Sequence, residues 1–143
     1  MDTYKKVWRK IIQDLENDDI IIEINIENII LKDWNTILSL IKNYYNSNIT
    51  ICIPISLADF PKLDKDDIQS VKINFKRFEI NLDLFDPIKM NFYTDSIINL
   101  TVEDILPLFR FCEDISNSIE KKIYIYCEGY KFPSAKFYKK WEW

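Results

Sequence analysis

Gly129 is the only glycine in this chain of 143 residues, and the chain contains no histidine. Glycine lets the backbone wrap closely around a phosphate, and the glycine-dependent patterns GxGxxG and GxxxxGK[ST] are absent. Histidine is the one side chain that titrates near pH 7 without help. Its absence excludes Ser-His-Asp and Cys-His nucleophilic sites, histidine bases and histidine metal sites.

The composition predicts one folded domain over residues 1–143. Hydrophobic residues make up 48% of the chain and charged residues 29%, which is far from the composition of a disordered protein. Residues 1–9 are polar, without the apolar stretch of an export signal, and no window approaches the roughly 18 uncharged apolar residues of a membrane span. Cys52, Cys112 and Cys127 form no CxxC pair, so we expect reduced thiols in a cytoplasmic protein.

The charge is unevenly distributed along the chain. The net charge is -4, and residues 118–143 contain six lysines and three glutamates, so that residues 1–117 carry -7. An acidic chain is a poor nonspecific ligand for nucleic acid, which needs a positive face for its phosphates. We therefore expect a basic protein partner, without nucleic acid or a membrane.

The first half of the chain predicts a helix followed by a strand-helix-strand unit. Apolar residues from Tyr4 to Leu15 recur at helical spacing, and residues 20–27 alternate with a period of two. Asp33 is placed to cap a helix over residues 34–45, and residues 49–55 alternate as another strand. A connection through a helix favours parallel neighbouring strands with a right-handed crossover.

The second half predicts more strands and a second unit. Alternation over residues 71–84 changes phase at Lys76 and Arg77, which a bulge or a hairpin turn would explain; the absence of Asn-Gly and Asp-Gly slightly favours the bulge. After an irregular segment around residues 86–94, Thr101 and Asp104 resemble a capping box for a helix that contains Pro107. A strand over residues 123–127 follows.

Together these segments predict a single layered α/β or α+β domain, with a mixed sheet of about five or six strands and two to four helices. The two strand-helix-strand units match at an offset of 68 residues, where Asp33 aligns with Thr101. A duplication would explain this match, and so would shared patterning in a chain with 26 isoleucines.

Carboxylates are the remaining candidates for chemistry. Glu23 with Glu27, or Glu103 with Asp104, could hold Mg²⁺ or perform acid–base work in a metal-dependent hydrolase. A structural interpretation is favoured, because the first pair lies on the polar face of a strand and the second in the first turn of a helix. We therefore expect no catalytic residues, no cofactor and no metal.

Two segments are candidates for binding a partner. One is an acidic loop, and the other is the aromatic, lysine-rich C-terminal tail, whose rings could anchor an interface or fold back onto the core. The candidate partner-binding residues are Asp59, Asp64, Asp66, Asp67, Tyr130, Tyr138, Trp141 and Trp143.

In size, acidity and lack of catalytic groups, the chain is similar to bacterial immunity proteins, which neutralise a toxin by occluding its active site or blocking its activation. This similarity implies a noncatalytic module that binds a basic toxin such as a nuclease, with electrostatic attraction speeding the encounter. A carboxylate-dependent hydrolase and a structural or adaptor subunit are the alternatives.

Overall fold

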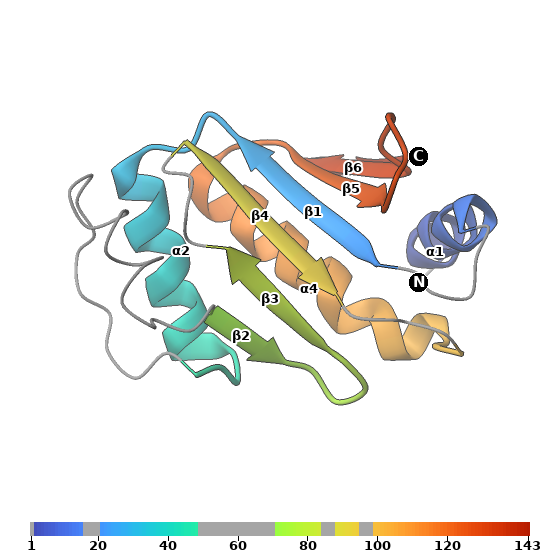
Figure 1. Ribbon diagram of the computed structural model, residues 1–143, viewed down its shortest axis with the longest axis horizontal. Coiled ribbons are helices and arrows are strands. Elements are labelled where there is room, and N and C mark those ends of the chain that lie inside the picture. The colour runs from blue at the N-terminus through green and yellow to red at the C-terminus, as the bar shows by residue number, and fades with distance from the viewer. Residues whose placement is uncertain (1, 16–20, 49–70, 84–87, 95–98) are drawn as a thin grey trace.

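The structure is a computed structural model, and it describes residues 2–15, 21–48, 71–83, 88–94 and 99–143. Within these residues, seven strands form one sheet in the order β2-β3-β4-β1-β5-β6-β7, and three helices accompany it (Figure 1). The helices are α1 (Asp2–Asp14), α2 (Leu31–Tyr44) and α4 (Val102–Ile119). The strands are β1 (Ile22–Glu27), β2 (Val71–Asn74), β3 (Glu79–Asp83), β4 (Lys89–Thr94), β5 (Ile123–Cys127), β6 (Ala135–Tyr138) and β7 (Lys140–Glu142).

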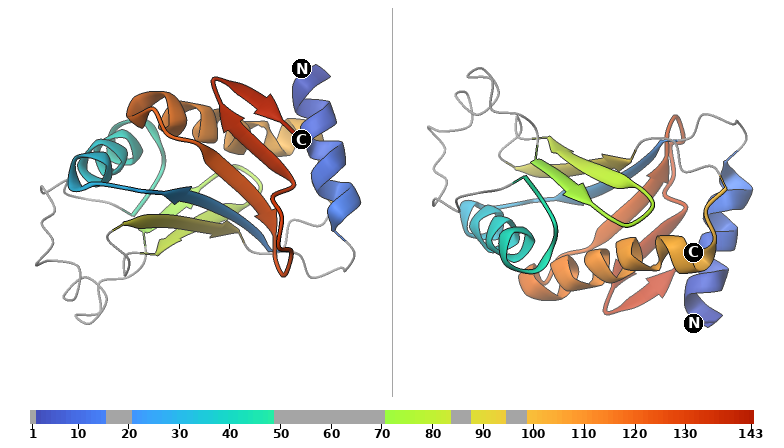
Figure 2. Two further views of the ribbon diagram at one scale, coloured as in Figure 1. Left: turned by 90° about the horizontal axis from the view of Figure 1, so that it is seen from above. Right: turned by 90° about the horizontal axis from the view of Figure 1, so that it is seen from below.

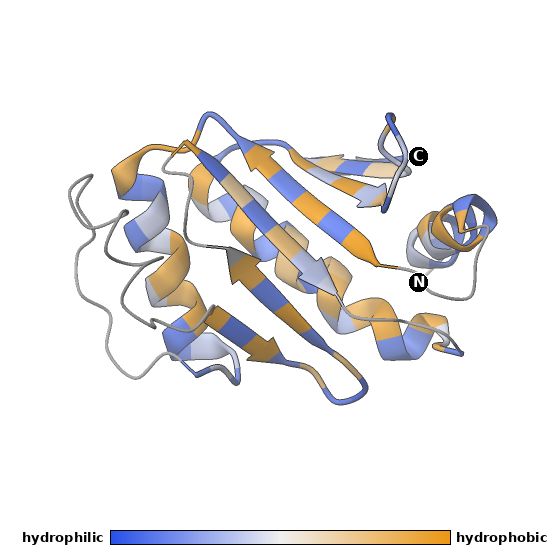
Figure 3. Ribbon diagram, viewed as in Figure 1, coloured by the Kyte–Doolittle hydropathy of each residue, from blue (hydrophilic) through white to orange (hydrophobic). Residues whose placement is uncertain are grey.

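The three described helices lie over one face of the sheet (Figure 2). We call the other face, over which no helix of the described residues lies, the open face. Hydrophobic and hydrophilic residues alternate along the strands (Figure 3), so each strand turns its apolar side toward the helices. Ile22, Ile24 and Ile26 of β1 are fully buried in the core, against the helical stripe of α4 that includes Phe109 and Ile115. The open face is built from the intervening polar residues.

The α+β fold class expected from the sequence is confirmed, but the sheet differs in two respects. The described residues contain more strands than the five or six expected, because β4 lies in the segment that the sequence predicts to be irregular and the sequence does not predict β6 and β7. The expected strand over residues 49–55 lies outside the described residues. Strands β4 and β5 each pair antiparallel with β1, so they run in the same direction with β1 between them. The helical connection through α4 therefore joins parallel strands that are not neighbours, and every observed pairing is antiparallel.

The phase change at Lys76 and Arg77 is a hairpin turn rather than a bulge. Strands β2 and β3 pair antiparallel on either side of it, and the Phe75 amide donates to the Phe78 carbonyl at 2.8 Å. The rings of Phe75 and Phe78 stack with their centroids 4.9 Å apart. This aromatic pair stabilises the turn without glycine.

Non-glycine residues occupy most of the left-handed backbone positions in the described residues. Asn28, Asn99, Glu120 and Lys139 have φ between 56° and 66°, beside Gly129 at 87°. Asparagine tolerates this conformation best among L residues, whereas a glutamate or lysine there is uncommon. Glu120 ends α4, and Lys139 forms the turn between β6 and β7.

The N-terminal ends of α2 and α4 confirm one predicted helix cap and correct the other. Thr101 caps α4 as expected, and its hydroxyl accepts from the Asp104 amide at 3.3 Å. Asp33 is not the N-cap of α2 but its third helical residue, and its carboxylate accepts from the Ile30 amide at 3.1 Å. Asp33 therefore corresponds in role to Asp104, 71 residues later, and not to Thr101 at the offset of 68.

Glu113 of α4 connects the two ends of the chain. Its carboxylate accepts hydrogen bonds from the Tyr4 hydroxyl at 2.8 and 3.0 Å and from the Trp141 indole at 3.0 Å. The Trp141 ring also packs against Phe109, with centroids 5.3 Å apart. These contacts fix α1 and β7 against α4, and they place the C-terminal strand beside the N-terminal helix.

Candidate functional site

The structure separates the residues that the sequence proposed for binding. Asp59, Asp64, Asp66 and Asp67 lie outside the described residues. The four aromatic candidates do not form one cluster: Tyr130 lies in the turn between β5 and β6, Tyr138 is half-buried on β6, Trp141 is buried, and Trp143 is 51% exposed. Trp141 thus follows the alternative in which the tail folds back onto the core, while Tyr130 and Trp143 remain on the surface.

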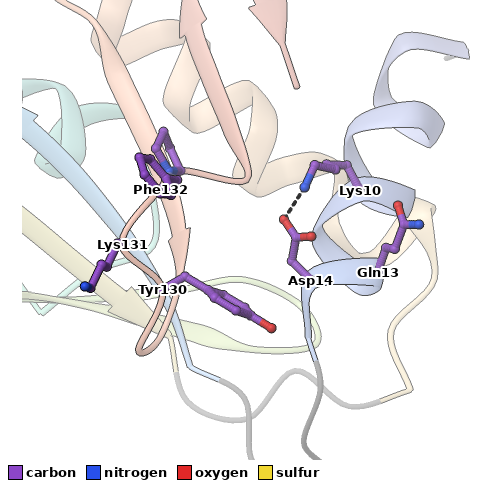
Figure 4. A pocket seen from close by; sticks show the side chains of 7 residues that line it. Lys10, Gln13, Asp14, Tyr130, Lys131 and Phe132 are labelled. Carbon is purple, nitrogen blue, oxygen red and sulfur yellow. Dashed lines mark hydrogen bonds and ion pairs between the residues drawn. The ribbon is translucent and has the colours of Figure 1, made fainter.

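The turn between β5 and β6 lies beside the end of α1 and borders a groove of about 290 Å³ (Figure 4). We call this site the aromatic groove. It is lined by Lys10, Gln13, Asp14, Tyr130, Lys131, Phe132 and Pro133. Phe132 is 81% exposed, which makes it the most exposed of the large hydrophobic side chains among the described residues.

Contacts with β5 and with α1 hold the turn that carries Phe132 in place. The Tyr130 amide donates to the Cys127 carbonyl at 3.1 Å, and the Ser134 amide donates to the Ile125 carbonyl at 2.8 Å. Cys127 Sγ lies 3.3 Å from the Ser134 hydroxyl and 3.7 Å from the Ile11 carbonyl of α1. Gly129 supplies the left-handed φ of 87° within the turn. These contacts position the exposed rings on a fixed base.

The polar side of the aromatic groove is an ion pair. Lys10 Nζ lies 2.5 Å from Asp14 Oδ2, one helical turn later. Partial burial raises the pKa of Asp14, but the Lys10 ammonium and the Ser134 hydroxyl outweigh it and hold this pKa below its usual value. Burial raises the pKa of the Cys127 thiol, which keeps this sulfur protonated and poorly nucleophilic. The groove therefore offers apolar contact, one ion pair and a further lysine, Lys131.

Phe132 and Lys10 were not among the residues proposed from the sequence. The signal for Phe132 was its position before Pro133 and shortly after the only glycine, a combination typical of an exposed turn. Lys10 had no such signal, because it reaches the groove through packing between segments about 120 residues apart in the sequence.

The two carboxylate pairs considered for catalysis lie in different elements of the fold. Glu23 and Glu27 lie on the open face of β1, and Asp104 accepts a hydrogen bond from the Thr101 amide at 3.0 Å as part of the helix cap. Within the part of the chain that the structure describes, no three carboxylate or cysteine side chains lie close enough together to hold a metal ion. The same residues include no helix with the length and apolar character needed to cross a bilayer.

Comparisons with protein-family models, with curated proteins and with solved structures find no match to this chain.

Proposed function

We propose that this chain is a noncatalytic protein-binding module, and most specifically a small acidic inhibitor of the immunity type that binds and neutralises a basic toxin domain. The exposed ring of Phe132, held on a fixed turn beside α1, is the observation that carries the proposal. Rigid, exposed aromatic side chains beside apolar and charged groups are typical anchors of protein interfaces. Burying a phenylalanine side chain contributes about 1.5–3 kcal/mol, enough to be measured in a single substitution.

The charge of the chain supports a basic partner. The net charge of -4 and the -7 carried by residues 1–117 would attract such a protein at long range. Electrostatic attraction of this kind raises the association rate and is screened by salt. The aromatic groove would then hold the complex through short-range contact, which determines the dissociation rate. A bacterial, cytoplasmic setting belongs to the same proposal, in keeping with three cysteines that include no CxxC pair.

The test begins with recovery of the partner by affinity purification on the full chain, followed by binding kinetics with the purified partner. We expect Phe132→Ala to weaken binding about tenfold or more, mainly through faster dissociation. Tyr44→Ala is the matched control, since Tyr44 is an 80% exposed aromatic residue on α2, away from the aromatic groove. Equal losses for both variants would remove the aromatic groove from the interface.

The salt dependence tests the charge argument separately. For a basic partner, the association rate should fall steeply between low and physiological ionic strength, while the dissociation rate changes little. An association rate that stays constant with salt would contradict an electrostatically attracted partner. Recovery of nothing but the chain itself would contradict the binding-module proposal and favour a self-associating structural subunit.

A further inference from the structure

The hairpin of β6 and β7 gathers lysine side chains on the open face of the sheet. Phe137 and Trp141 are buried, so the residues that alternate with them along these two strands lie on the face opposite the helices. The turn between the strands adds Lys139, and the segment before β5 adds Lys122. We call this group the lysine-tyrosine patch, and it consists of Lys122, Lys136, Tyr138, Lys139, Lys140 and Glu142.

A single carboxylate shows how closely these lysines lie together. Lys136 pairs in register with Glu142, and its Nζ lies 3.1 Å from the Glu142 carboxylate. The Lys136 ammonium, and after it the charges of Lys140 and Lys122, hold the pKa of Glu142 below its usual value. Lysines from the segment before β5, from β6 and from β7 therefore surround one glutamate.

The patch carries more positive charge than it can neutralise. Its four lysines and one glutamate give a net charge of +3, on a chain whose net charge is -4. Among the described residues, no carboxylate lies within 4 Å of the ammonium groups of Lys122, Lys139 or Lys140, and these three residues are exposed. On β1, beyond β5, Glu27 is paired in register with another lysine, Lys89. Like charges held together destabilise a folded chain, so stability does not account for this cluster.

Two properties of the patch favour carboxylates over nucleic acid as its ligand. Lys139 Nζ lies over the Tyr138 ring, 5.3 Å from its centre, so a lysine of the chain itself lies where a base would stack. In addition, the patch spans only three neighbouring strand positions, roughly 10 Å. A longer phosphate chain would continue onto a protein whose residues 1–117 carry -7. A short acidic segment matches both the size and the charge of the patch.

We infer that the lysine-tyrosine patch binds a short carboxylate-rich segment of the partner protein. Acidic side chains two residues apart in an extended segment lie about 7 Å from one another, a spacing that fits the exposed ammonium groups. The patch is separate from the aromatic groove, because Phe132 precedes β6 and Lys139 follows it. The partner would present basic residues to the acidic part of the chain and acidic residues to the patch, which fixes the orientation of the complex. The inference rests on the proposed function for the existence of a protein partner, but the chemistry of the patch can be tested without it.

The first test uses the full chain at low salt and capped heptapeptides Gly-X-Gly-X-Gly-X-Gly, in which X is glutamate or glutamine, followed by NMR. We expect the glutamate peptide to shift the Tyr138 ring signals and the Lys139 and Lys140 amide signals in a saturable way. The glutamine peptide, which has the same shape without the charge, should bind at least about tenfold more weakly. Equal binding of the glutamine peptide would overturn the inference, as would no shift with the glutamate peptide.

A thymidine tetranucleotide tests the choice between carboxylate and phosphate. Its three phosphates match the charge of the three glutamates in the peptide. We expect it to bind more weakly than the glutamate peptide, because the Tyr138 ring is not open to a base. Tighter binding of the tetranucleotide at the same signals would assign the patch to nucleic acid and overturn the inference.

Matched double variants locate the binding. Lys139→Gln with Lys140→Gln should weaken binding of the glutamate peptide about tenfold, because it removes two of the three exposed charges. Lys32→Gln with Lys42→Gln removes the same charge from exposed positions on α2, on the helical side of the sheet, and should leave the affinity unchanged. Equal losses for the two double variants would show attraction by net charge alone and overturn the patch as a site.

A further variant keeps the test independent of the hairpin. Lys122 lies outside β6 and β7, so Lys122→Gln tests the patch even where the hairpin substitutions prevent folding. We expect it to weaken binding of the glutamate peptide about threefold, as the loss of one exposed charge pair predicts. An unchanged affinity for Lys122→Gln together with an unchanged affinity for the hairpin variant would overturn the inference.

The two proposals fail in different ways. If the glutamate peptide binds at the patch and no partner is recovered, the patch stands and the inhibitor function falls. If a partner is recovered and the double variant at Lys139 and Lys140 leaves its affinity unchanged, the function stands and the patch lies outside the interface.

Discussion

The C-terminal end of α4 tests whether a left-handed backbone position that is not occupied by glycine destabilises this chain. Glu120 ends the helix with φ 56° and ψ 46°, and its amide donates to the Ser116 carbonyl at 2.8 Å. The left-handed conformation costs an L residue about 1–2 kcal/mol, and glycine usually fills this position. In addition, the negative charge of Glu120 lies at the negative end of the helix dipole. We therefore predict that Glu120→Gly stabilises the protein.

The expected gain follows from three terms. Relief of the left-handed backbone contributes about 1–2 kcal/mol, and the greater entropy of glycine in the unfolded chain offsets about 0.4–1 kcal/mol of it. Removal of the negative charge contributes a further 0.3–1 kcal/mol, approximately. The free energy of unfolding should rise by about 1.5 kcal/mol for Glu120→Gly, and by only about 0.5 kcal/mol for Glu120→Gln, which removes the charge and keeps the side chain. For a domain of this size, these gains raise the melting temperature by about 3–6 °C and 1–2 °C.

Thermal and urea unfolding followed by circular dichroism would measure both gains. Ser39→Gly, at an exposed position inside α2, is the matched control and should lower the free energy of unfolding by roughly 0.5 kcal/mol. If Glu120→Gly proves no more stable than Glu120→Gln, the gain comes from charge alone. The argument that the backbone at Glu120 is strained would then be refuted.

Three further predictions concern the termini, pH and the aromatic groove. Tyr4→Phe should lower the free energy of unfolding by about 1–2 kcal/mol in urea unfolding, because it removes the hydrogen bonds to Glu113, while the exposed Tyr44→Phe should leave it unchanged. The pKa values of Tyr4 and Tyr45 are raised by burial and then by a neighbouring carboxylate, so their contribution to stability is complete below pH 10 and is lost as the pH rises through the folded values. Urea unfolding at pH 8, 10 and 11 should show this fall, and a flat profile would contradict it. Phe132→Ala should keep the free energy of unfolding within about 0.5 kcal/mol, and a larger loss would place Phe132 in the fold rather than the interface.

The helices and several strands could be predicted because each has one buried side. The alternation through Ile22, Ile24 and Ile26 indicated β1, and helical spacing through Phe109 and Ile115 indicated α4. The order of the strands could not be predicted in this way, since the pairing of β1 with β4 and β5 depends on contacts between distant segments. Strand β7 is only three residues long, too short for a periodic signal.

The candidate sites show the same division between local and distant signals. Tyr130 and Trp143 were proposed from their aromatic, lysine-rich surroundings and are exposed, but the same reasoning selected Trp141, which Glu113 and Phe109 hold in the core. Neighbours across the sheet had no signal in the sequence. Asn25 and Asn91 are 66 residues apart, and only the register of β1 with β4 makes them neighbours.

The position of the single glycine connects the composition to the aromatic groove. Asn28, Asn99 and Lys139 have φ between 59° and 66°, inside the narrow left-handed region that L residues can occupy. Gly129 has φ 87°, outside that region, although an added Cβ would meet no atom within 4 Å. Space around the residue therefore does not require glycine there, but the backbone conformation does. The one glycine thus shapes the turn that presents Tyr130 and Phe132, which links the scarcest residue of the chain to the surface proposed to bind a partner.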